Sequence, residues 1–262
     1  MALPEIFLGV MLLLTIPCAR SVSFTFKTFY PNIGGISFQG DAFTSSGVLQ
    51  LTRNQVDNNL TYSAGRVSYI PPVQIWDSET GKLADFTSRF SFIAKDVKYD
   101  QTIYGDGLAF FLAPVDSEIP PKSVGGYLAL LSPDTAVNGS KQNQIVAVEF
   151  DSYQNPWDPS FDHVGINVNS IISVANAPWK NDIFNGAIVN AWVNYDSNAK
   201  NLSVFVSDTQ SPVFRGTYSL SYTVDLREVL PEWVRIGFSA ATGTAVETNS
   251  ILSWDFYSSL QQ

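Results

Sequence analysis

Short runs of alternating apolar and polar residues recur along most of the chain. A period of two places successive side chains on opposite faces of a β-strand, so each run predicts a strand with one buried face. Turn-forming residues separate the runs, and no segment keeps a helical apolar period beyond a turn or two. The predicted strands are residues 24–29, 36–38, 48–51, 66–70, 89–94, 108–113, 145–151, 164–168, 187–195, 202–207, 234–240 and 251–257. One helical turn is expected over residues 225–230, before Pro231.

This pattern predicts an all-β sandwich, in which two antiparallel sheets pack face to face and bury alternate side chains between them. A chain of 262 residues with 45% hydrophobic residues can bury a sizeable core. No linker, repeat or shift in composition divides the chain after residue 21. We therefore expect a single domain over residues 22–262.

The first 21 residues have a different character. An apolar run over residues 6–16 precedes the small residues Cys18, Ala19 and Ser21, as in a secretory signal peptide. A short membrane anchor is the alternative, although the run is shorter than the roughly 20 residues that a membrane span requires. We expect residues 1–21 to be a signal peptide and the product to be secreted or vacuolar.

Removing this leader changes the chemistry of the remaining chain. Cys18 is the only cysteine, and Met1 and Met11 are the only methionines, so the mature protein has no disulfide. Without Glu5 and Arg20, 23 acidic residues face 14 basic ones, and the net charge stays at −9. An acidic chain without a basic cluster argues against binding to nucleic acids or anionic membranes.

Three Asn-x-Ser/Thr sequences are candidate sites of N-glycosylation. They begin at Asn59, Asn138 and Asn201. Each alone could arise by chance, but together they agree with passage through the secretory pathway.

The segment from residue 145 to residue 167 combines a predicted strand, an acidic loop and the only histidine. Glu149 and Asp151 alternate with apolar residues, so both carboxylates lie on one face of the strand, and Asn155, Asp158 and His163 follow in the loop. Carboxylates held this close repel one another unless a cation lies among them. Carboxylate and amide oxygens suit Ca²⁺, and imidazole with carboxylates suits a transition ion such as Mn²⁺. A metal site is predicted; a solvated acidic loop is the alternative.

The same strand begins like the Glu-x-Asp-x-x-Glu signature of some sandwich-fold glycosidases. A retaining glycosidase needs two carboxyls about 5 Å apart. The third position of the signature is Gln154, which can serve neither as acid nor as nucleophile. A serine triad is also unsupported, because no Gly-x-Ser-x-Gly turn is present. Hydrolysis is therefore the less favoured interpretation, and we expect a protein that is not an enzyme.

Two glycine-containing stretches suggest close approach to the backbone. Gly105, Asp106 and Gly107 form a turn signature before a predicted strand, without the further glycine or lysine of a nucleotide-binding loop. The stretch SVGGYLALL over residues 123–131 offers glycines at which another group can approach backbone amides.

Taken together, these segments resemble a secreted legume lectin, a member of the L-type lectin family. The resemblance spans the mature chain in order and rests on SFTFKTFYPN, ISFQGDA, GDGLAFFLAPVD, VGGYLALL, VAVEFDSYQNPWDPSFDHVGINVNSI, LPEWVRIGFSAATG and ILSWDF. It implies a jelly-roll β-sandwich that binds Mn²⁺ and Ca²⁺ side by side. It also implies a shallow site above the calcium for mono- and oligosaccharides of glycoconjugates.

The resemblance assigns roles to individual residues. The manganese ligands would be Glu149, Asp151, Asp158 and His163, with Ser173 reached through water. The calcium ligands would be Asp151, the carbonyl of Tyr153, Asn155 and Asp158. The sugar would contact the Asp106 carboxylate, the Asn155 amide, the Gly126 backbone N–H and the Tyr153 ring. The family usually has alanine before this aspartate, joined by a cis peptide, whereas this chain has Gly105.

The loop over residues 242–252 bears on the sugar class. In legume lectins it forms one wall of the site, and galactose binders usually carry longer loops. Nine residues separate Gly243 from Ser253. This resembles the short form, in which the amides of Thr244 and Ala245 would reach a mannose- or glucose-type sugar. A galactose or fucose class, or a storage or defence protein without sugar binding, stays open. A homodimer or homotetramer is also implied.

Overall fold

The computed structural model describes residues 21–55, 59–97, 103–159, 162–179, 186–207 and 218–261. The predicted signal peptide lies outside these residues, apart from Ser21, which pairs with Ser259 at the start of the first strand. In the described part of the chain, no helix is long and apolar enough to cross a membrane.

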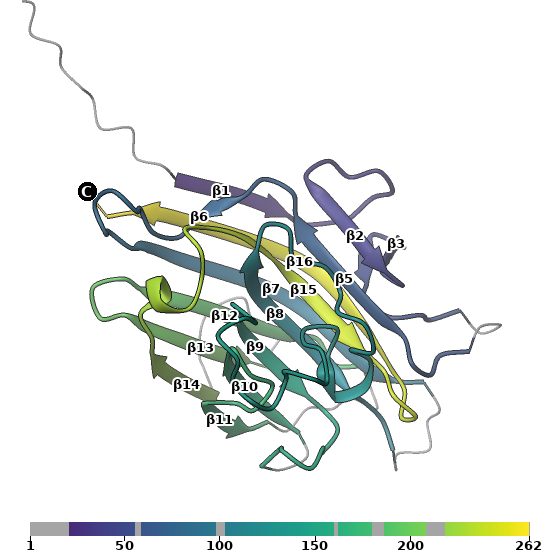
Figure 1. The fold of residues 1–262 in the computed structure, drawn as a ribbon. Helices are drawn as coiled ribbons and strands as arrows, with labels where there is room; N and C mark the ends of the chain where they lie inside the picture. The colour runs from purple at the N-terminus through teal and green to yellow at the C-terminus, as the bar shows by residue number, and fades with distance from the viewer. Residues whose placement is uncertain are drawn as a thin grey trace, which may run out of the picture.

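Two antiparallel sheets form the molecule (Figure 1). The front sheet has the strand order β11 (Ala175–Pro178), β10 (His163–Val168), β9 (Val146–Asp151), β8 (Gly107–Pro114), β15 (Trp233–Ala241), β5 (Ala64–Tyr69) and β2 (Ile36–Gly40), and β6 (Val73–Gln74) pairs with β15. The back sheet has the order β14 (Tyr218–Thr223), β13 (Asn201–Ser207), β12 (Val189–Asp196), β7 (Ala84–Asp96), β16 (Glu247–Leu260), β4 (Val48–Gln50) and β3 (Phe43–Ser45), and β1 (Ser21–Phe26) pairs with β16.

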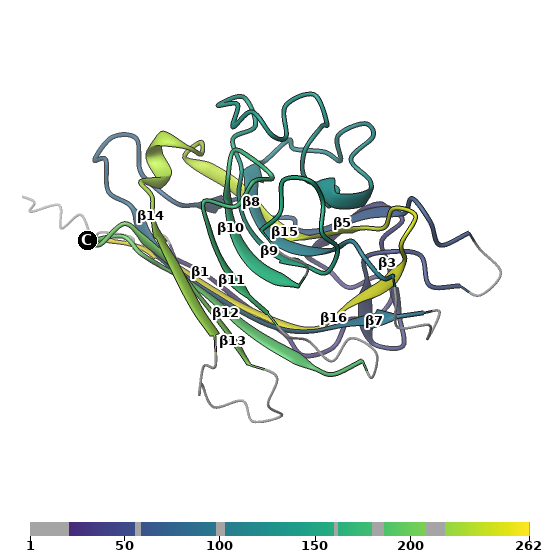
Figure 2. The same ribbon diagram turned by 90° about the horizontal axis from the view of Figure 1, so that it is seen from below.

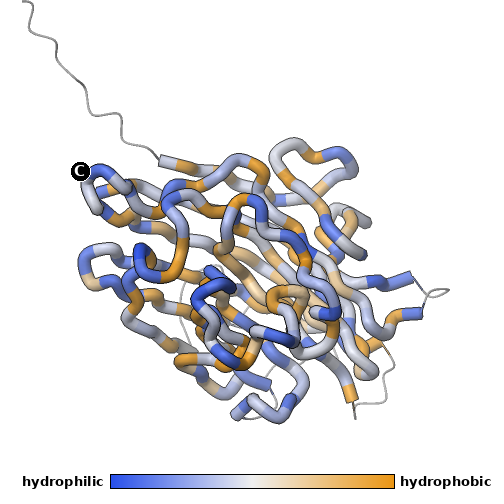
Figure 3. Tube along the Cα trace, in the orientation of Figure 1, coloured by the Kyte–Doolittle hydropathy of each residue, from blue (hydrophilic) through white to orange (hydrophobic). Residues whose placement is uncertain are grey.

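Figure 2 shows the two sheets as layers, with most of the long loops on the side of the front sheet that faces away from the back sheet. The layers meet in an aromatic core. The ring of Phe238 lies 4.9 Å from that of Phe90 and 4.8 Å from that of Trp254, and Phe92 lies 4.8 Å from Phe150. Hydrophobic and hydrophilic positions alternate along the strands in Figure 3, as a half-buried sheet requires.

A second, smaller apolar cluster covers the outer face of the front sheet. It joins β8 and β9 to the loop that carries the 3-10 helix η1 (Gly125–Tyr127), and it includes Ala109, Phe111, Ala147, Leu128, Leu130 and Leu131. The buried Arg66 of β5 holds the same loop, because its guanidinium donates to the carbonyls of Ala129 and Leu130 at 2.7 and 3.0 Å. The loop therefore rests on a fixed surface.

The predicted all-β sandwich is confirmed, and each predicted strand overlaps an observed one. The first strand is β1 (Ser21–Phe26) rather than residues 24–29, so this boundary was wrong by three residues at each end. The expected helical turn is present as η3 (Leu226–Glu228), and the Asp225 side chain accepts a hydrogen bond from the Arg227 N–H at its start. The strands β3, β6, β11 and β14 were not predicted.

Candidate functional site

The predicted metal ligands come from the paired strands β9 and β10 and the loop between them. Asp151 lies opposite His163 in the register, and Glu149 lies opposite Gly165. A Cβ atom on Gly165 would lie 2.6 Å from Glu149 Oε1 and 1.9 Å from Ser173 Oγ. Only a residue without a side chain leaves this space, so Gly165 makes room for Glu149 and Ser173.

The structure brings the acidic and imidazole groups together in a buried cluster. Ligand atoms of Asp151, Asp158 and His163 all lie within 4.8 Å of one another. His163 Nε2 lies 3.2 Å from Glu149 Oε1, to which the Ser173 hydroxyl also donates. The predicted spatial grouping is therefore present, and Ser173 lies within it.

The loop after β9 folds back on these carboxylates. The Tyr153 N–H donates to Asp151 Oδ1 at 2.8 Å, and the Asn155 N–H donates to Asp158 Oδ2 at 2.7 Å. On the other side, Asn167 Nδ2 donates to Glu149 Oε2 at 2.8 Å. Asn167 is a partner that the sequence reasoning missed, although it lies two residues beyond Gly165 on the same face of β10. These bonds fix the direction of the carboxylates.

Electrostatics in the cluster favour a cation. Burial raises the pKa of Asp151 well above its usual value, and the neighbouring Glu149 and Asp158 charges raise it further. Burial also raises the pKa of Asp158 to about 6. A cation among these groups would reverse both effects, because an opposite charge favours the ionised form. Three carboxylates, an amide oxygen and an imidazole therefore fit a divalent metal site.

Asp106 lies beside this cluster, at the start of β8. The Gly105–Asp106 peptide bond is cis, as the resemblance implied. The backbone of Asp106 is held from both sides, because its N–H donates to the Ala241 carbonyl at 3.2 Å and its carbonyl accepts from the Ser152 N–H at 3.1 Å. Burial raises the pKa of its carboxyl to about 7, against a lowering by the Gly243 backbone N–H. No described residue hydrogen-bonds to the buried Oδ2 atom.

Asn155 and η1 form the neighbouring part of the site. A Cβ atom on Gly126 would lie 1.9 Å from Asn155 Oδ1, so this amide rests directly on bare backbone. Asn155 Oδ1 is also buried, and within the described residues nothing donates to it. The adjacent Gly125 lies against Asp106, with its Cβ position 3.8 Å from Oδ1. Two unpaired acceptors therefore sit against two consecutive glycines, where a hydroxylated or cationic ligand can satisfy them.

The remaining predicted sugar contacts are Tyr153, Thr244 and Ala245. Tyr153 is half-buried and packs over Gly105, where a Cβ atom would lie 2.6 Å from Tyr153 Cβ. Thr244 is exposed in the turn between β15 and β16, whereas Ala245 is buried. Whether these residues contact sugar remains a prediction. Gly243 was missed by the sequence reasoning; its Cβ position lies 3.1 Å from Asp106 Oδ2.

The three candidate glycosylation sites differ in their surroundings. Asn59 and Asn138 are exposed. Asn201 begins β13, is half-buried, and donates from Nδ2 to Ser203 Oγ at 2.8 Å. Glycan attachment at each remains a prediction.

An antiparallel sandwich with a carboxylate and histidine cluster beside unpaired acceptors has the architecture of a ligand-binding β-sandwich protein. The family described as "Legume lectin domain" matches residues 21–262. Lectin 7 of Medicago truncatula is 49% identical over 249 residues, which cover 92% of this chain and 91% of that protein. The chain belongs to the legume lectin family, whose members are non-enzymatic carbohydrate-binding proteins.

Solved structures agree with this assignment and with the predicted jelly-roll fold. Lectin I-B4 of Griffonia simplicifolia in its metal-free form is 47% identical, with a TM-score of 0.81 over 90% of this chain and 99% of that one. Lectin II of Ulex europaeus, solved in complex with galactose, is 43% identical, with a TM-score of 0.79 over 90% of this chain and 98% of that one.

Proposed function

We propose that this chain is a secreted lectin that requires Ca²⁺ and Mn²⁺ and binds sugars of the mannose and glucose class. The observation that carries the proposal is the pair of buried oxygens, Asp106 Oδ2 and Asn155 Oδ1, to which none of the described residues donates. Leaving buried acceptors unpaired is unfavourable, so a ligand that satisfies them gains affinity. A sugar hydroxyl would donate to Asp106 Oδ2, and Ca²⁺ would satisfy Asn155 Oδ1. Oligosaccharides of glycoconjugates are the proposed partners.

The donor set supports two ions with shared ligands. Manganese would be held by Glu149, Asp151, Asp158 and His163, with Ser173 reached through water. Calcium would be held by Asp151, Asp158, the Tyr153 carbonyl and the Asn155 side chain. When bound, the ions supply the positive charge that keeps the buried carboxylates ionised. Asn155 would then turn its oxygen towards calcium and its N–H₂ group towards the sugar.

The chain's own groups provide the rest of the sugar site. The Asp106 carboxylate accepts from two hydroxyls, and the Gly126 backbone N–H donates to a third. The bonds to the Asp106 carboxylate are charge-assisted, and such bonds are roughly twice as strong as neutral ones. The half-buried ring of Tyr153 provides a flat apolar wall for the C–H face of the sugar.

The sugar class rests on the turn between β15 and β16. Its short form supports contacts from the amides of Thr244 and Ala245 to hydroxyls in the manno or gluco arrangement. Stereoisomers differ only in which hydroxyls meet such fixed donors, so the preference is geometric. The galactose complex of the Ulex europaeus relative supports galactose as the competing class, and fucose is a further alternative. A storage or defence role without sugar binding is disfavoured by the intact acceptors.

A glycan array with and without EDTA tests the proposal. Binding to mannose-containing glycans that EDTA abolishes, and that Ca²⁺ with Mn²⁺ restores, would support it. Inhibition of agglutination by methyl α-mannoside but not by galactose, lactose or fucose would support the sugar class. Galactose inhibiting at a lower concentration than mannose would overturn the class and leave lectin activity intact. Absence of binding to every glycan would overturn both.

The setting of the protein follows from the same proposal. Residues 1–21 would be a signal peptide, and the family match that begins at residue 21 supports a boundary there. The mature protein would be extracellular or vacuolar, glycosylated at Asn59, Asn138 or Asn201, and assembled as a homodimer or homotetramer. N-terminal sequencing, intact mass and light scattering of the secreted product test these points.

A further inference from the structure

A buried glutamate, Glu247, is hydrogen-bonded to the loop that carries the candidate metal ligands. We propose that Glu247 is a positioning residue, which fixes the Asp106 backbone relative to this loop by holding Ser152. It acts through Ser152 and contacts neither the sugar nor an ion. This inference rests on the proposed function and adds to it a residue that sets the geometry of the same site.

The first link is the hydroxyl of Ser152. It donates to Glu247 Oε2 at 2.6 Å, and the exposed fractions of the two residues are only 3% and 1%. Ser152 lies between Asp151 and Tyr153, whose carboxylate and carbonyl are proposed calcium ligands. Because Ser152 is bonded covalently to both neighbours, a shift of its backbone would move both of these ligand groups.

The second link is the backbone of Ser152. Its N–H donates to the Asp106 carbonyl at 3.1 Å, next to the Gly105–Asp106 peptide bond. Ser152 therefore binds Glu247 with its side chain and Asp106 with its main chain. The three residues form a continuous series of hydrogen-bonded contacts from the start of β16 to the proposed sugar site.

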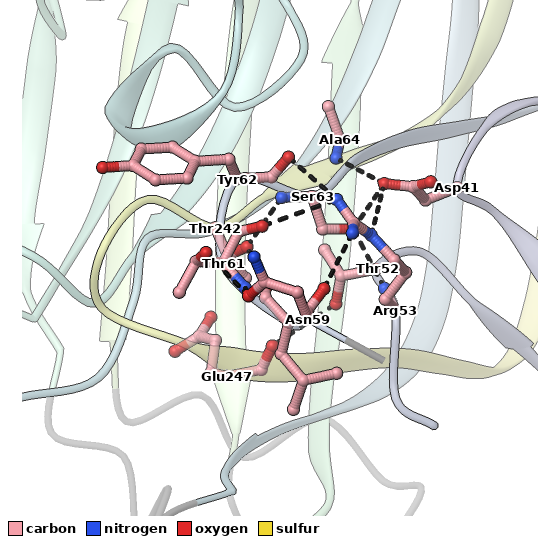
Figure 4. Close-up of polar contacts among 11 residues, drawn as sticks. Asp41, Thr52, Arg53, Asn59, Thr61, Tyr62, Ser63, Ala64, Thr242 and Glu247 are labelled. Atoms are coloured by element: carbon pink, nitrogen blue, oxygen red, sulfur yellow. Dashed lines mark hydrogen bonds and ion pairs between the residues drawn. The ribbon is translucent and has the colours of Figure 1, made fainter. Parts of the chain in front are cut away.

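Glu247 can serve as an anchor because its own backbone is held in the back sheet. It pairs with Asp96 of β7 in the strand register. Its carbonyl accepts from the Thr52 hydroxyl at 3.3 Å, a contact that can be followed in Figure 4. Two residues further on, the Asn249 carbonyl accepts from the Leu51 N–H at 2.9 Å. The carboxyl group thus projects from a strand that is fixed on both sides.

The turn before β16 ends at the same residue. Thr242 holds the start of this turn, because its hydroxyl accepts from the Ser63 N–H at 2.9 Å and its carbonyl accepts from the Gly125 N–H at 3.1 Å (Figure 4 shows the first contact). The predicted sugar contacts Thr244 and Ala245 lie between Thr242 and Glu247. Glu247 is therefore placed to fix the end of the turn as well as Ser152.

Stability alone does not explain a glutamate at this position. The buried residues Ile251, Trp254 and Phe256, further along β16, are apolar, whereas Glu247 and Asn249 are polar and equally buried. Burying a polar group costs free energy that an apolar side chain would not. The change from apolar to polar residues occurs at the end of β16 that lies beside Ser152, which favours a role in the site.

The charge of the carboxyl group also suits this role. Burial raises the pKa of Glu247 to about 8; the Asp106 and Asp162 charges act in the same direction, and the Ser152 and Asn249 side chains act against it. The group is therefore mostly neutral at pH 7 and adds no full negative charge beside Asp106. Glutamine, which is neutral and has the same shape, should be able to replace it.

The test measures the affinity of the metal-loaded protein for methyl α-mannoside by calorimetry at pH 7, or for methyl α-galactoside where the array selects galactose. Ser152→Ala removes the hydroxyl and leaves every proposed ligand in place. We expect it to lower sugar affinity about fivefold, which corresponds to about 1 kcal/mol. Glu247→Leu should cause a similar loss. Glu247→Gln should keep the affinity within about twofold, because its side-chain oxygen still accepts from Ser152.

A matched control separates positioning from general stability. Ser88→Ala also removes a buried hydroxyl, one that accepts from Trp254 Nε1 at 3.0 Å in the core between the sheets. It should lower the melting temperature about as much as Ser152→Ala and leave sugar affinity unchanged. Equal loss of affinity in these two variants, or full affinity in Ser152→Ala, would overturn the positioning role.

A double variant tests whether the two residues act through one contact. In the Glu247→Leu background, Ser152→Ala should cause no further loss of affinity, whereas additive losses would contradict the proposed link. If Glu247→Leu does not fold, the comparison of Ser152→Ala with Ser88→Ala decides the question. All of these outcomes leave lectin activity intact. Failure of the wild-type protein to bind any sugar would instead overturn the proposed function itself.

Discussion

At the scale of single residues, two side-chain oxygens of the candidate site pack directly against glycines. Asn155 Oδ1 rests on Gly126, and Glu149 Oε1 lies at the position that a side chain of Gly165 would occupy. In both places the glycine is required by the space that its neighbour fills, rather than by a positive φ angle. The consequence is that small changes in these glycines should act on the ligand site before they act on the fold.

Asp106 provides the most direct test of the proposed sugar site. Asp106→Asn replaces an acceptor by a donor and mispairs the sugar hydroxyls, at a cost of about 1.5 to 3 kcal/mol, or at least about tenfold in affinity. Thermal stability should change little, because the Oδ2 atom bonds to none of the described residues. Calorimetric titration with sugar measures the effect, and the exposed Asp116→Asn is the control. A folded Asp106→Asn protein with normal affinity would remove this residue from the site.

Gly126 tests the contact between η1 and Asn155. In Gly126→Ala the new Cβ atom would displace the Asn155 amide, since the two would be 1.9 Å apart. We expect the loss of about 1 to 3 kcal/mol of sugar binding and weaker retention of Ca²⁺. Gly34→Ala is the control, because its Cβ position has no neighbour within 4 Å. Equal sugar affinity in the two variants would contradict the packing described for Asn155.

Sequence reasoning at this scale identified side chains better than their contacts. The capacity of Glu149, Asp158 and His163 to act as metal ligands can be predicted from residue type and spacing. The approach of Gly243 to Asp106 is not, because it depends on how β15 pairs with β8 across a long stretch of chain. Position along the sequence carries no information about that register, whereas a motif carries information about ligand chemistry.

At the scale of elements, one side-chain contact joins the two loops of the site. The Tyr104 hydroxyl lies 3.2 and 3.1 Å from the two carboxylate oxygens of Asp162. Tyr104 precedes the Gly105–Asp106 turn, and Asp162 precedes the metal-ligand candidate His163 in β10. The contact thus couples the loop of the proposed sugar site to the loop of the candidate metal ligands.

Tyr104→Phe removes this hydrogen bond while keeping the ring. We expect the Ca²⁺ concentration needed for half-maximal sugar binding to rise about fivefold, which corresponds to about 1 kcal/mol. The control is Tyr195→Phe, which loses a 2.9 Å bond to the Val224 carbonyl. Calcium titrations of both variants, followed by sugar binding, measure the difference. A similar shift in the two variants would reduce the role of Tyr104 to general stability.

The elements that sequence patterns missed are those whose pairing comes from tertiary contact. β6 and β3 have two and three residues, too few to show an alternation. β11 carries Pro178 in its last position and lies at an edge of the front sheet, where proline is tolerated. Long central strands such as β7 and β16 were found, although their ends extend further than the apolar pattern predicted.

At the scale of the whole molecule, its buried carboxyl groups determine how stability depends on pH. Burial raises the pKa values of Asp106, Asp158 and Glu247 to about 7, 6 and 8. A carboxyl whose pKa is higher in the folded than in the unfolded protein stabilises the fold while it is protonated. This stabilisation is fully present below the pKa of the unfolded chain, about 4, and is lost as the pH rises through the pKa of the folded protein. The demetallated protein should therefore lose stability between about pH 5 and pH 8.

The metal-loaded protein should show a different dependence. Its ligands must be deprotonated to bind the ions, so the stabilisation by Ca²⁺ and Mn²⁺ should grow over the same pH range and disappear in acid. Melting temperatures at several pH values, with EDTA or with both ions, measure the difference between the two forms. A difference that stays constant with pH would contradict the assignment of these carboxylates as metal ligands.

The place of β16 in the back sheet has a consequence for biosynthesis. This strand lies between β7 and β4 and also pairs with β1. Until it emerges from the ribosome, β1 has no other described strand to pair with, and β7 and β4 each lack one of their two neighbours. Gly243, which packs against the Asp106 carboxylate, is synthesised only shortly before β16. A chain still in synthesis has no complete binding site. On the secretory route proposed above, the chain would therefore acquire its capacity to bind glycans only after β16 has joined the sheet.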